Sequence, residues 1–257
     1  MSSLLAEFIG TTILLLLGIG VNANTSLRNT IGNKDSNWVL ITMAWGLSVF
    51  IAVFITAQFS GAHLNPAVTI GLAVTGKFSW SLVSGYVIAQ LSGAIFGSWL
   101  AYITYIDHYR VTKDEEKVRG SFCTGPAIRN YKNNFFSELI GTFILVFAVF
   151  YIAKPILEIE GEVINFGLGA LDALPVGIVV WVIGMTLGGT TGFAINPARD
   201  FGPRLISYFN GWSEIAFSYN GIGWLVVYIL GPLTGGALAA IVFKLTLKKK
   251  SFLVLGK

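Results

Sequence analysis

The stretch SGAHLNPAVTIG, from Ser60 to Gly71, returns 131 residues later as TGFAINPARDFG, from Thr191 to Gly202. A single Asn-Pro-Ala motif is weak evidence, because many helices begin with an asparagine cap and a proline in the first turn. Two copies in matching apolar surroundings indicate an internal duplication, which is typical of channels and transporters built from repeats. The motif residues are Asn65, Pro66 and Ala67 in the first copy and Asn196, Pro197 and Ala198 in the second.

The duplication extends well beyond the two motifs. At the same offset, Glu7 in AEFIGT matches Glu138 in SELIGT, and Gly46 matches Gly177. After a further 11-residue insertion, the run YVIAQLSGAIFG at 86–97 matches YILGPLTGGALA at 228–239. The whole chain therefore consists of two related halves.

The composition is that of a polytopic membrane protein. The 257 residues are 54% hydrophobic and 12% charged, whereas soluble domains carry about 25% charged residues. A single cysteine, Cys123, excludes an internal disulfide and a cysteine-based metal site. We expect no cofactor and no metal. The net charge of +4 is modest and forms no basic stripe, so we expect no nucleic acid partner.

Six apolar runs are long enough to cross a bilayer, and they predict a single transmembrane channel domain over residues 1–257. The first repeat covers about 4–105, a polar loop 106–134, and the second repeat about 135–245. The first run carries Glu7 and no basic region before it, which favours a span over a signal peptide. The predicted spans are Leu4–Ala23, Trp38–Ala57, Trp80–Tyr105, Phe135–Ala153, Leu171–Thr190 and Gly223–Leu245.

The distribution of basic residues gives a mixed indication of orientation. Lys248, Lys249 and Lys250 follow the last span and favour a cytoplasmic C-terminus. The loop 106–134 also holds six basic residues and would then face outward. We predict that both termini are cytoplasmic, in a membrane that the short tails suggest is a bacterial inner membrane.

Each Asn-Pro-Ala motif predicts the start of a half-length helix. The first would run from Asn65 to about Thr75, where Gly76 stops it. Its length of about 16 Å is half of a bilayer core of about 30 Å. Two such half-helices entering from opposite faces would meet at the midplane with their positive dipole ends facing each other.

Two carboxylates and a histidine lie at membrane depth, where polar groups are costly. Glu7 and Glu138 could carry protons, or could accept hydrogen bonds from the irregular backbone that leads into each half-helix. Their occurrence once per repeat favours the second interpretation. His63 could ligate a metal, but no second ligand lies nearby in sequence, which favours an orienting hydrogen bond beneath the pore loop.

Arg199 is a cation in the first turn of the second half-helix, where it opposes the helix dipole. Its counterpart in the first half is Val68, so the duplication does not explain it. A salt bridge to Asp200 is one interpretation, and a pore-lining charge that repels cations is the other. With a cytoplasmic N-terminus, three further residues fall in the same outer layer: Trp45, Gly184 and Phe193. Trp45 alone could be an interfacial aromatic, and Phe193 alone could be core packing.

The doubled Asn-Pro-Ala and the run NPARDFGPR resemble the aquaporin (major intrinsic protein) family, in its glycerol facilitator branch, over about Leu4 to Lys244. This resemblance implies an all-α membrane fold with six transmembrane helices, two re-entrant half-helices and two inverted repeats. It also implies a homotetramer, loop-bracing roles for Glu7 and Glu138, and a pore constriction. The constriction would consist of Trp45, Gly184, Phe193 and Arg199, and further markers of the glycerol branch are Tyr105, Asp200, Arg204, Pro232 and Leu233.

We therefore predict a passive channel for glycerol and other small neutral solutes, with some water and without protons or ions. Two aromatics would meet the carbon backbone of glycerol, Arg199 would donate to its hydroxyls, and Gly184 would leave room. The amides of Asn65 and Asn196 would donate at the midplane. Backbone carbonyls would accept along the pore at Gly61, Ala62, His63, Gly192, Phe193 and Ala194.

Three other classes of protein compete with this prediction. A water-selective channel usually carries a histidine where Gly184 stands. A secondary transporter would share inverted repeats and broken helices, but would need a coupling site beyond Glu7 and Glu138. A membrane enzyme is the weakest alternative, because no nucleophile–base pair or metal-ligand cluster stands out.

Overall fold

The computed structural model describes residues 1–34, 37–152, 156–159, 162–165, 169–217 and 221–254. Six helical segments within these ranges are long and apolar enough to cross a membrane. The prediction of an all-α membrane protein with six spans is therefore confirmed. Four of the spans are single helices, α1 (Ser3–Ser26), α2 (Trp38–Ser60), α4 (Trp80–Thr104) and α7 (Tyr131–Tyr151). The fifth, Gly169–Leu187, combines the 3-10 helix η2 (Gly169–Ala173) with α8 (Leu174–Leu187), and the sixth is Gly223–Leu247.

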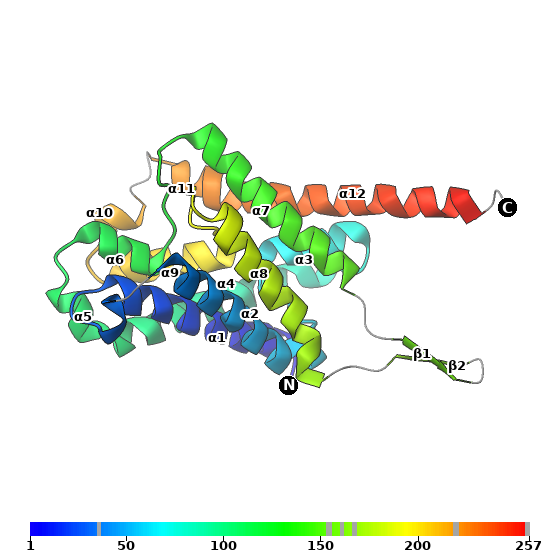
Figure 1. The fold of residues 1–257 in the computed structure, drawn as a ribbon, viewed down its shortest axis with the longest axis horizontal. Coiled ribbons are helices and arrows are strands. Elements are labelled where there is room, and N and C mark those ends of the chain that lie inside the picture. The colour runs from blue at the N-terminus through cyan, green and yellow to red at the C-terminus, as the bar shows by residue number, and fades with distance from the viewer. Residues whose placement is uncertain (35–36, 153–155, 160–161, 166–168, 218–220, 255–257) are drawn as a thin grey trace.

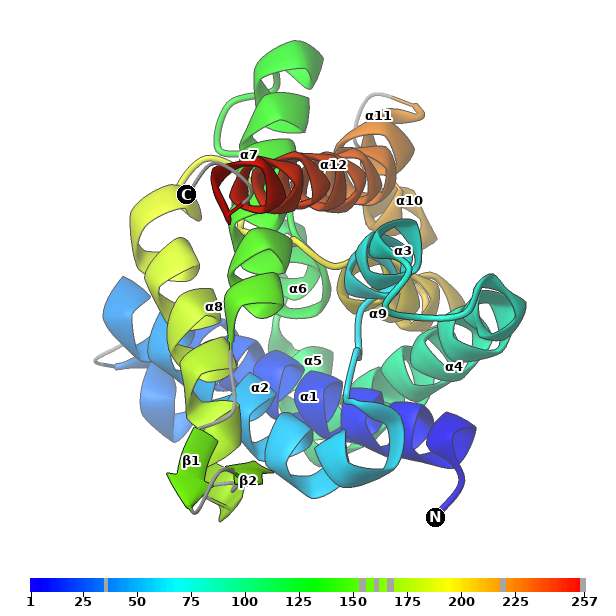
Figure 2. The ribbon, with the colours of Figure 1, turned by 90° about the vertical axis from the view of Figure 1, so that its right-hand side faces the viewer.

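Two shorter helices begin at the Asn-Pro-Ala motifs, as expected. Helix α3 (Pro66–Thr75) has Asn65 as its N-cap and ends at Gly76, whose φ of 80° is the left-handed conformation that glycine adopts readily. Helix α9 (Pro197–Phe209) has Asn196 as its N-cap. Figure 2 shows α3 and α9 next to each other, between α12 and α4.

The two halves pack by the same contacts. Helix α1 lies against α2 and α4, and α7 lies against α8 and the last helix, α12 (Gly231–Val254). Glycines allow these approaches: a Cβ at Gly93 would meet the carbonyl oxygen of Phe8 at 2.4 Å, and one at Gly235 would meet that of Leu139 at 2.3 Å. Such small residues at close helix contacts are typical of membrane proteins.

Gly46 of α2 and Gly177 of α8 lie where the two halves cross. A Cβ on either glycine would meet the carbonyl oxygen of the other at 2.7 Å. This reciprocal contact between duplicated positions is what a two-fold relation between the halves requires. Each half-helix packs on a helix of the other half: α3 of the first half packs on α12, and α9 of the second half packs on α4.

The last span is bent rather than straight. Helix α11 (Gly223–Leu225) leads into a π-helical turn, η3 (Val226–Leu230), and then into α12. Pro232 lies two residues after the end of the π turn and cannot donate a backbone hydrogen bond, which is a known cause of local helix distortion. The distortion of the last span near Pro232 takes the form of a π turn. Helix α12 continues past the predicted end at Leu245 and projects from the bundle (Figure 1).

The connecting segments hold more regular structure than expected. Helix α7 begins at Tyr131, four residues before the predicted Phe135, because Asn130 caps it by accepting from the backbone N–H of Asn133. The segment predicted as a polar loop, 106–134, contains two short helices. The remaining elements are η1 (Ile31–Asn33), α5 (Ile106–Val111), α6 (Glu115–Phe122), α10 (Ser213–Ala216) and an antiparallel pair of strands, β1 (Ile156–Ile159) and β2 (Glu162–Asn165).

Candidate channel pore

The chain entering each half-helix adopts a strained backbone. Ala62 and Leu64 have φ values of 49° and 51°, and their counterparts Phe193 and Ile195 have 42° and 43°. Left-handed conformations are unfavourable for residues other than glycine, above all for a β-branched one such as Ile195. Both loops therefore need support from the surrounding structure.

Glu138 supports the second loop from within α7. Its Oε1 accepts from the Thr191 hydroxyl at 2.7 Å and from the backbone N–H of Ala194 at 2.9 Å, and its Oε2 accepts from the backbone N–H of Ile195 at 2.8 Å. The side chain is fully buried. These are the contacts that the loop-bracing interpretation requires.

Glu7 makes the equivalent contacts in the first half. Its carboxylate accepts from the Ser60 hydroxyl at 2.6 Å and from the backbone N–H groups of His63 and Leu64 at 2.9 and 2.8 Å. One additional donor breaks the symmetry: the Gln90 amide donates to Glu7 at 2.7 Å and to the Thr69 hydroxyl at 2.9 Å. Pro232 occupies the position of Gln90 in the second half. Sequence reasoning missed Gln90, although a buried amide matched to a proline was a usable signal.

The two motif asparagines join the half-helices across the molecule. Asn65 Oδ1 accepts from the Ala67 N–H at 2.8 Å, so its amide nitrogen faces the other loop and donates to the Ile195 carbonyl at 2.8 Å. In the same way, Asn196 Nδ2 donates to the Leu64 carbonyl at 2.9 Å. Each amide nitrogen carries two protons, and one of them remains for a solute. These two hydrogen bonds between the loops were not predicted.

A cavity of about 120 Å³ runs past both asparagines. Five of the six residues predicted to present carbonyls lie in its wall, and Gly192 does not. Among the described residues, the backbone hydrogen bonds outside the helices and strands include none to the carbonyl oxygens of these six residues. The five residues in the wall are Gly61, Ala62, His63, Phe193 and Ala194.

Three of the predicted constriction residues come together in the wall of this cavity. The Arg199 guanidinium carbon lies 4.1 Å from the centre of the Trp45 ring and 6.0 Å from that of Phe193. The two aromatic rings meet edge to face at 6.5 Å. All three side chains are buried and line the cavity.

Arg199 does not form the alternative salt bridge to Asp200. The Asp200 carboxylate instead binds Arg204, with Nε to Oδ2 at 2.6 Å, and both side chains are fully buried. The buried Nη1 of Arg199 has no acceptor among the described residues. A buried cationic donor without a partner is costly, and the Arg199 side chain is one of those that line the cavity.

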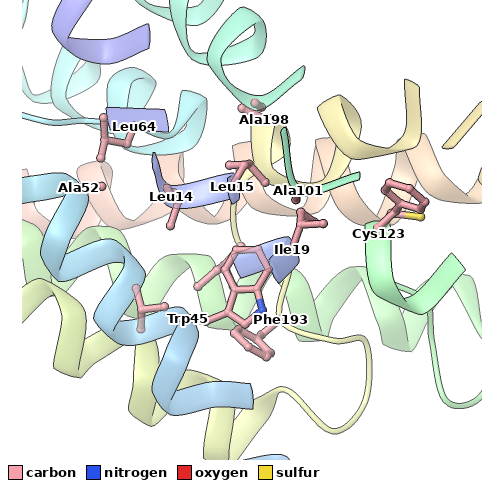
Figure 3. Close-up of a cluster of buried hydrophobic side chains, with 14 of the residues drawn as sticks. Leu14, Leu15, Ile19, Trp45, Ala52, Leu64, Ala101, Cys123, Phe193 and Ala198 are labelled. Carbon is pink, nitrogen blue, oxygen red and sulfur yellow. The ribbon is translucent and has the colours of Figure 1, made fainter. Parts of the chain in front are cut away.

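Trp45 is held in place by residues of α1 that sequence reasoning missed. Its Nε1 donates to Asn22 Oδ1 at 3.1 Å. A Cβ at Gly18 would lie 2.4 Å from two ring atoms of Trp45, so only glycine leaves room for the indole. Figure 3 shows Trp45 and Phe193 next to each other, with Leu14 and Ile19 of α1 nearby. A polar Asn22 within an apolar span was a signal that we did not use.

Gly184 does not line the cavity, in contrast to the expectation that it leaves room for a solute. A Cβ there would meet Thr42 at 2.9 Å and two ring atoms of Phe193 at 3.1 Å. Its small size therefore makes room for the Phe193 ring. The Gly184 carbonyl also accepts from Trp38 Nε1 at 3.0 Å, and Trp38 meets Phe193 edge to face at 5.8 Å.

The remaining predicted residues lie around the pore or apart from it. His63 packs against Phe78 and Tyr86, and its Nδ1 lies 3.1 Å from the Thr69 hydroxyl. Tyr105, Pro232 and Leu233 do not line the cavity. No group of three or more histidine, cysteine, aspartate or glutamate side chains that could hold a metal is found among the described residues.

Comparison with known proteins identifies the class to which this fold and pore belong. The family model described as "Major intrinsic protein" matches residues 1–243, and the chain belongs to that family. A relative from Thermotoga maritima, named "Probable glycerol uptake facilitator protein", is 46% identical over 243 residues, which are 93% of this chain and 97% of the relative.

Two further comparisons agree. A glycerol uptake facilitator protein from Streptococcus pneumoniae is 41% identical over 248 residues, covering 95% of this chain and 99% of the relative. The X-ray structure of the aquaglyceroporin from Plasmodium falciparum superimposes with a TM-score of 0.80 at 31% identity, covering 94% of each chain. The fold is therefore the aquaporin fold.

Proposed function

We propose that this protein is a passive channel that conducts glycerol and other small uncharged solutes, with some water, and that excludes protons and ions. The observation that carries the proposal is the guanidinium of Arg199, which lies in the cavity wall beside the rings of Trp45 and Phe193 and forms no ion pair with Asp200. A site with one hydrogen-bonding side and one aromatic side matches a molecule with a hydroxyl edge and a carbon edge. The names of the similar proteins support the same substrate.

A solute entering the cavity must exchange its hydration for contacts with the protein. Trp45 and Phe193 offer an apolar corner to the carbon backbone of glycerol, and Arg199 donates to its hydroxyls. Farther along, the carbonyls of the two strained loops accept, and the amides of Asn65 and Asn196 donate. Because these donors and acceptors are fixed, the replacement of water costs little reorganisation.

Ion and proton exclusion follows from the same groups. Arg199 places a positive charge in the cavity wall, and the N-termini of α3 and α9 add positive dipole ends at the midplane. A water between Asn65 and Asn196 accepts hydrogen bonds from both amides. Its own protons then face carbonyls on either side, which disfavours a continuous proton wire.

The alternatives receive less support. A water-selective pore needs a bulky polar wall opposite Arg199, and Phe193 stands there with Gly184 behind it. A proton-coupled transporter needs a carboxylate that changes its charge during transport. Both oxygens of Glu7 and of Glu138 are instead engaged by loop N–H groups. We propose that the protein acts as a channel and not as an enzyme.

The quaternary structure and orientation belong to the same proposal. We propose a homotetramer with one pore per subunit and with both termini in the cytoplasm, in a bacterial inner membrane. The run of three lysines at 248–250 supports the orientation. The resemblance to glycerol facilitators supports the assembly.

Light scattering by proteoliposomes in stopped flow tests the function. An inward glycerol gradient should cause shrinkage followed by fast re-swelling, at a rate far above that of protein-free liposomes. A sucrose gradient should cause shrinkage alone. Fast shrinkage in sucrose without fast re-swelling in glycerol would identify a water channel instead and would overturn the proposal.

A further inference from the structure

The two halves of the chain differ in several residues at and after the second pore loop. Phe193, Arg199, Asp200 and Arg204 match Ala62, Val68, Thr69 and Ala73 of the first half. The first two of these second-half residues line the cavity. The other two do not, so their departure from the repeat needs a separate explanation.

Asp200 and Arg204 both bind Thr124, which lies in the segment 106–134 that connects the two halves and is called the outer segment below. Thr124 donates to Asp200 Oδ1 through its backbone N–H, at 2.9 Å, and through its hydroxyl. Its carbonyl accepts from Arg204 Nη2 at 2.8 Å. Arg204 also donates to the Ala216 carbonyl at 2.6 Å, which joins the segment after α9 to the same cluster.

The side chain of Thr124 also packs against the pore loop. A Cβ at Gly192 would lie 3.1 Å from the Thr124 methyl and 3.3 Å from its Cβ. Gly192 has a φ of 85° and directly precedes Phe193, whose φ is 42°. The methyl of Thr124 thus fills the space beside the strained residue that carries the constriction ring.

The inner loop lacks this support. Gly61 is the counterpart of Gly192, and a Cβ there would meet only the ring of His63, at 3.7 Å. Glu7 and Glu138 accept equivalent hydrogen bonds from the two loops, and the one additional donor, Gln90, acts on the Glu7 side. The contact with Thr124 is specific to the loop that carries Phe193.

We infer that Thr124 is a positioning residue that sets the place of Phe193, and through it the discrimination of the pore between solutes of different size. Arg204 and Asp200 hold Thr124 by both its backbone groups and its hydroxyl. The Thr124 methyl then occupies the space beside Gly192 and limits the movement of the loop that carries the Phe193 ring. The inference rests on the proposed function in taking glycerol and related polyols as the solutes. The effect of Thr124 on the position of Phe193 applies to any molecule that passes through the pore, including water.

Two substitutions separate the two contacts of Thr124. Thr124→Ser keeps the hydroxyl bond to Asp200 and removes the methyl beside Gly192. Thr124→Val keeps the shape and leaves Asp200 with one donor fewer. Thr112→Ser and Thr112→Val are matched controls. Thr112 is also buried in the outer segment and also hydrogen-bonded, to the Arg28 N–H at 2.9 Å and the His108 carbonyl at 2.7 Å, but it does not touch the pore loop.

The readout is the permeability of proteoliposomes to water, glycerol and a five-carbon polyol. Thr124→Ser should raise the ratio of five-carbon polyol to glycerol by about threefold or more, since small changes in a pocket alter discrimination measurably, while its melting temperature stays close to that of the wild type. Thr124→Val should lower the melting temperature, because it leaves a buried carboxylate short of a donor. Neither Thr112 variant should change the ratio.

Equal ratios and equal water permeability in Thr124→Ser and Thr112→Ser would overturn the inference. A wild-type protein that conducts water but no glycerol would overturn the proposed function alone. The water permeability of Thr124→Ser relative to Thr112→Ser would still test the role of Thr124 in that case, with a change supporting it and no change refuting it.

Discussion

Gly18→Ala should narrow the constriction without altering any residue of the pore wall. The added Cβ would lie 2.4 Å from Cη2 and Cζ3 of Trp45. An ordinary contact is about 3.5 Å, so the ring must move by about 1 Å. Helix α1 lies behind the indole and Arg199 lies in front of it, so the ring moves toward the cavity.

The expected loss of glycerol permeability follows from the free-energy cost of overpacking a buried site, which is about 1–3 kcal/mol. If about 1.4 kcal/mol of this appears in the barrier to glycerol, permeation falls about tenfold. Water is smaller and should be affected less, so the glycerol-to-water ratio should fall. Stopped-flow light scattering with glycerol and sucrose gradients measures both permeabilities.

Gly20→Ala provides the control. Gly20 lies on the same helix, and a Cβ there would meet nothing within 4 Å. It should conduct like the wild type. If Gly18→Ala folds normally and conducts glycerol at the wild-type rate, then Trp45 does not limit the passage of glycerol and the assignment of the constriction is wrong.

Three further predictions concern the loops, the pore charge and the segment 106–134. Glu138→Ala leaves three buried donors unpaired at about 1–3 kcal/mol each, so the free energy of unfolding should fall by about 3 kcal/mol or more; an unchanged melting temperature would refute the bracing role. Arg199→Val should admit cations, which a potential-sensitive dye in proteoliposomes would detect; intact exclusion would mean that the dipoles and asparagines suffice. Burial raises the pKa of the Cys123 thiol, so the thiolate forms only at a pH above its usual range and maleimide labelling of the native protein should be slow at neutral pH; rapid labelling at pH 7 without denaturant would contradict the buried position.

The duplication made much of the architecture predictable. An offset of 131 residues related both motifs and both glutamates, and the glycines at 46 and 177 meet at the crossing of the halves. The half-helix ending at Gly76 was predictable because a proline start and a glycine stop are local signals. The segment 106–134 was not, because its short helices α5 and α6 depend on packing and lack a long apolar period.

The pore was only partly predictable. Arg199 departed from the repeat, whereas Trp45 and Phe193 were inferred from their shared layer and from the family resemblance, and the structure brings the three together. Gly184 was expected to face the solute, but it lies against the Phe193 ring and does not line the cavity. Its position in the sequence does not tell which side of Phe193 it faces. Thr124 carried no sequence signal, because its importance arises from contacts with Asp200, Arg204 and Gly192 that only the folded chain creates.

The central claim is that glycerol passes without protons and without energy coupling. Proteoliposomes loaded with a pH-sensitive dye, given a glycerol gradient together with a potassium diffusion potential, measure both fluxes at once. The account predicts that glycerol equilibrates at a rate that is linear in concentration and independent of potential, while the dye signal matches that of protein-free liposomes. Proton entry that accompanies glycerol, or a saturating flux that follows the potential, would contradict the channel and identify a coupled transporter.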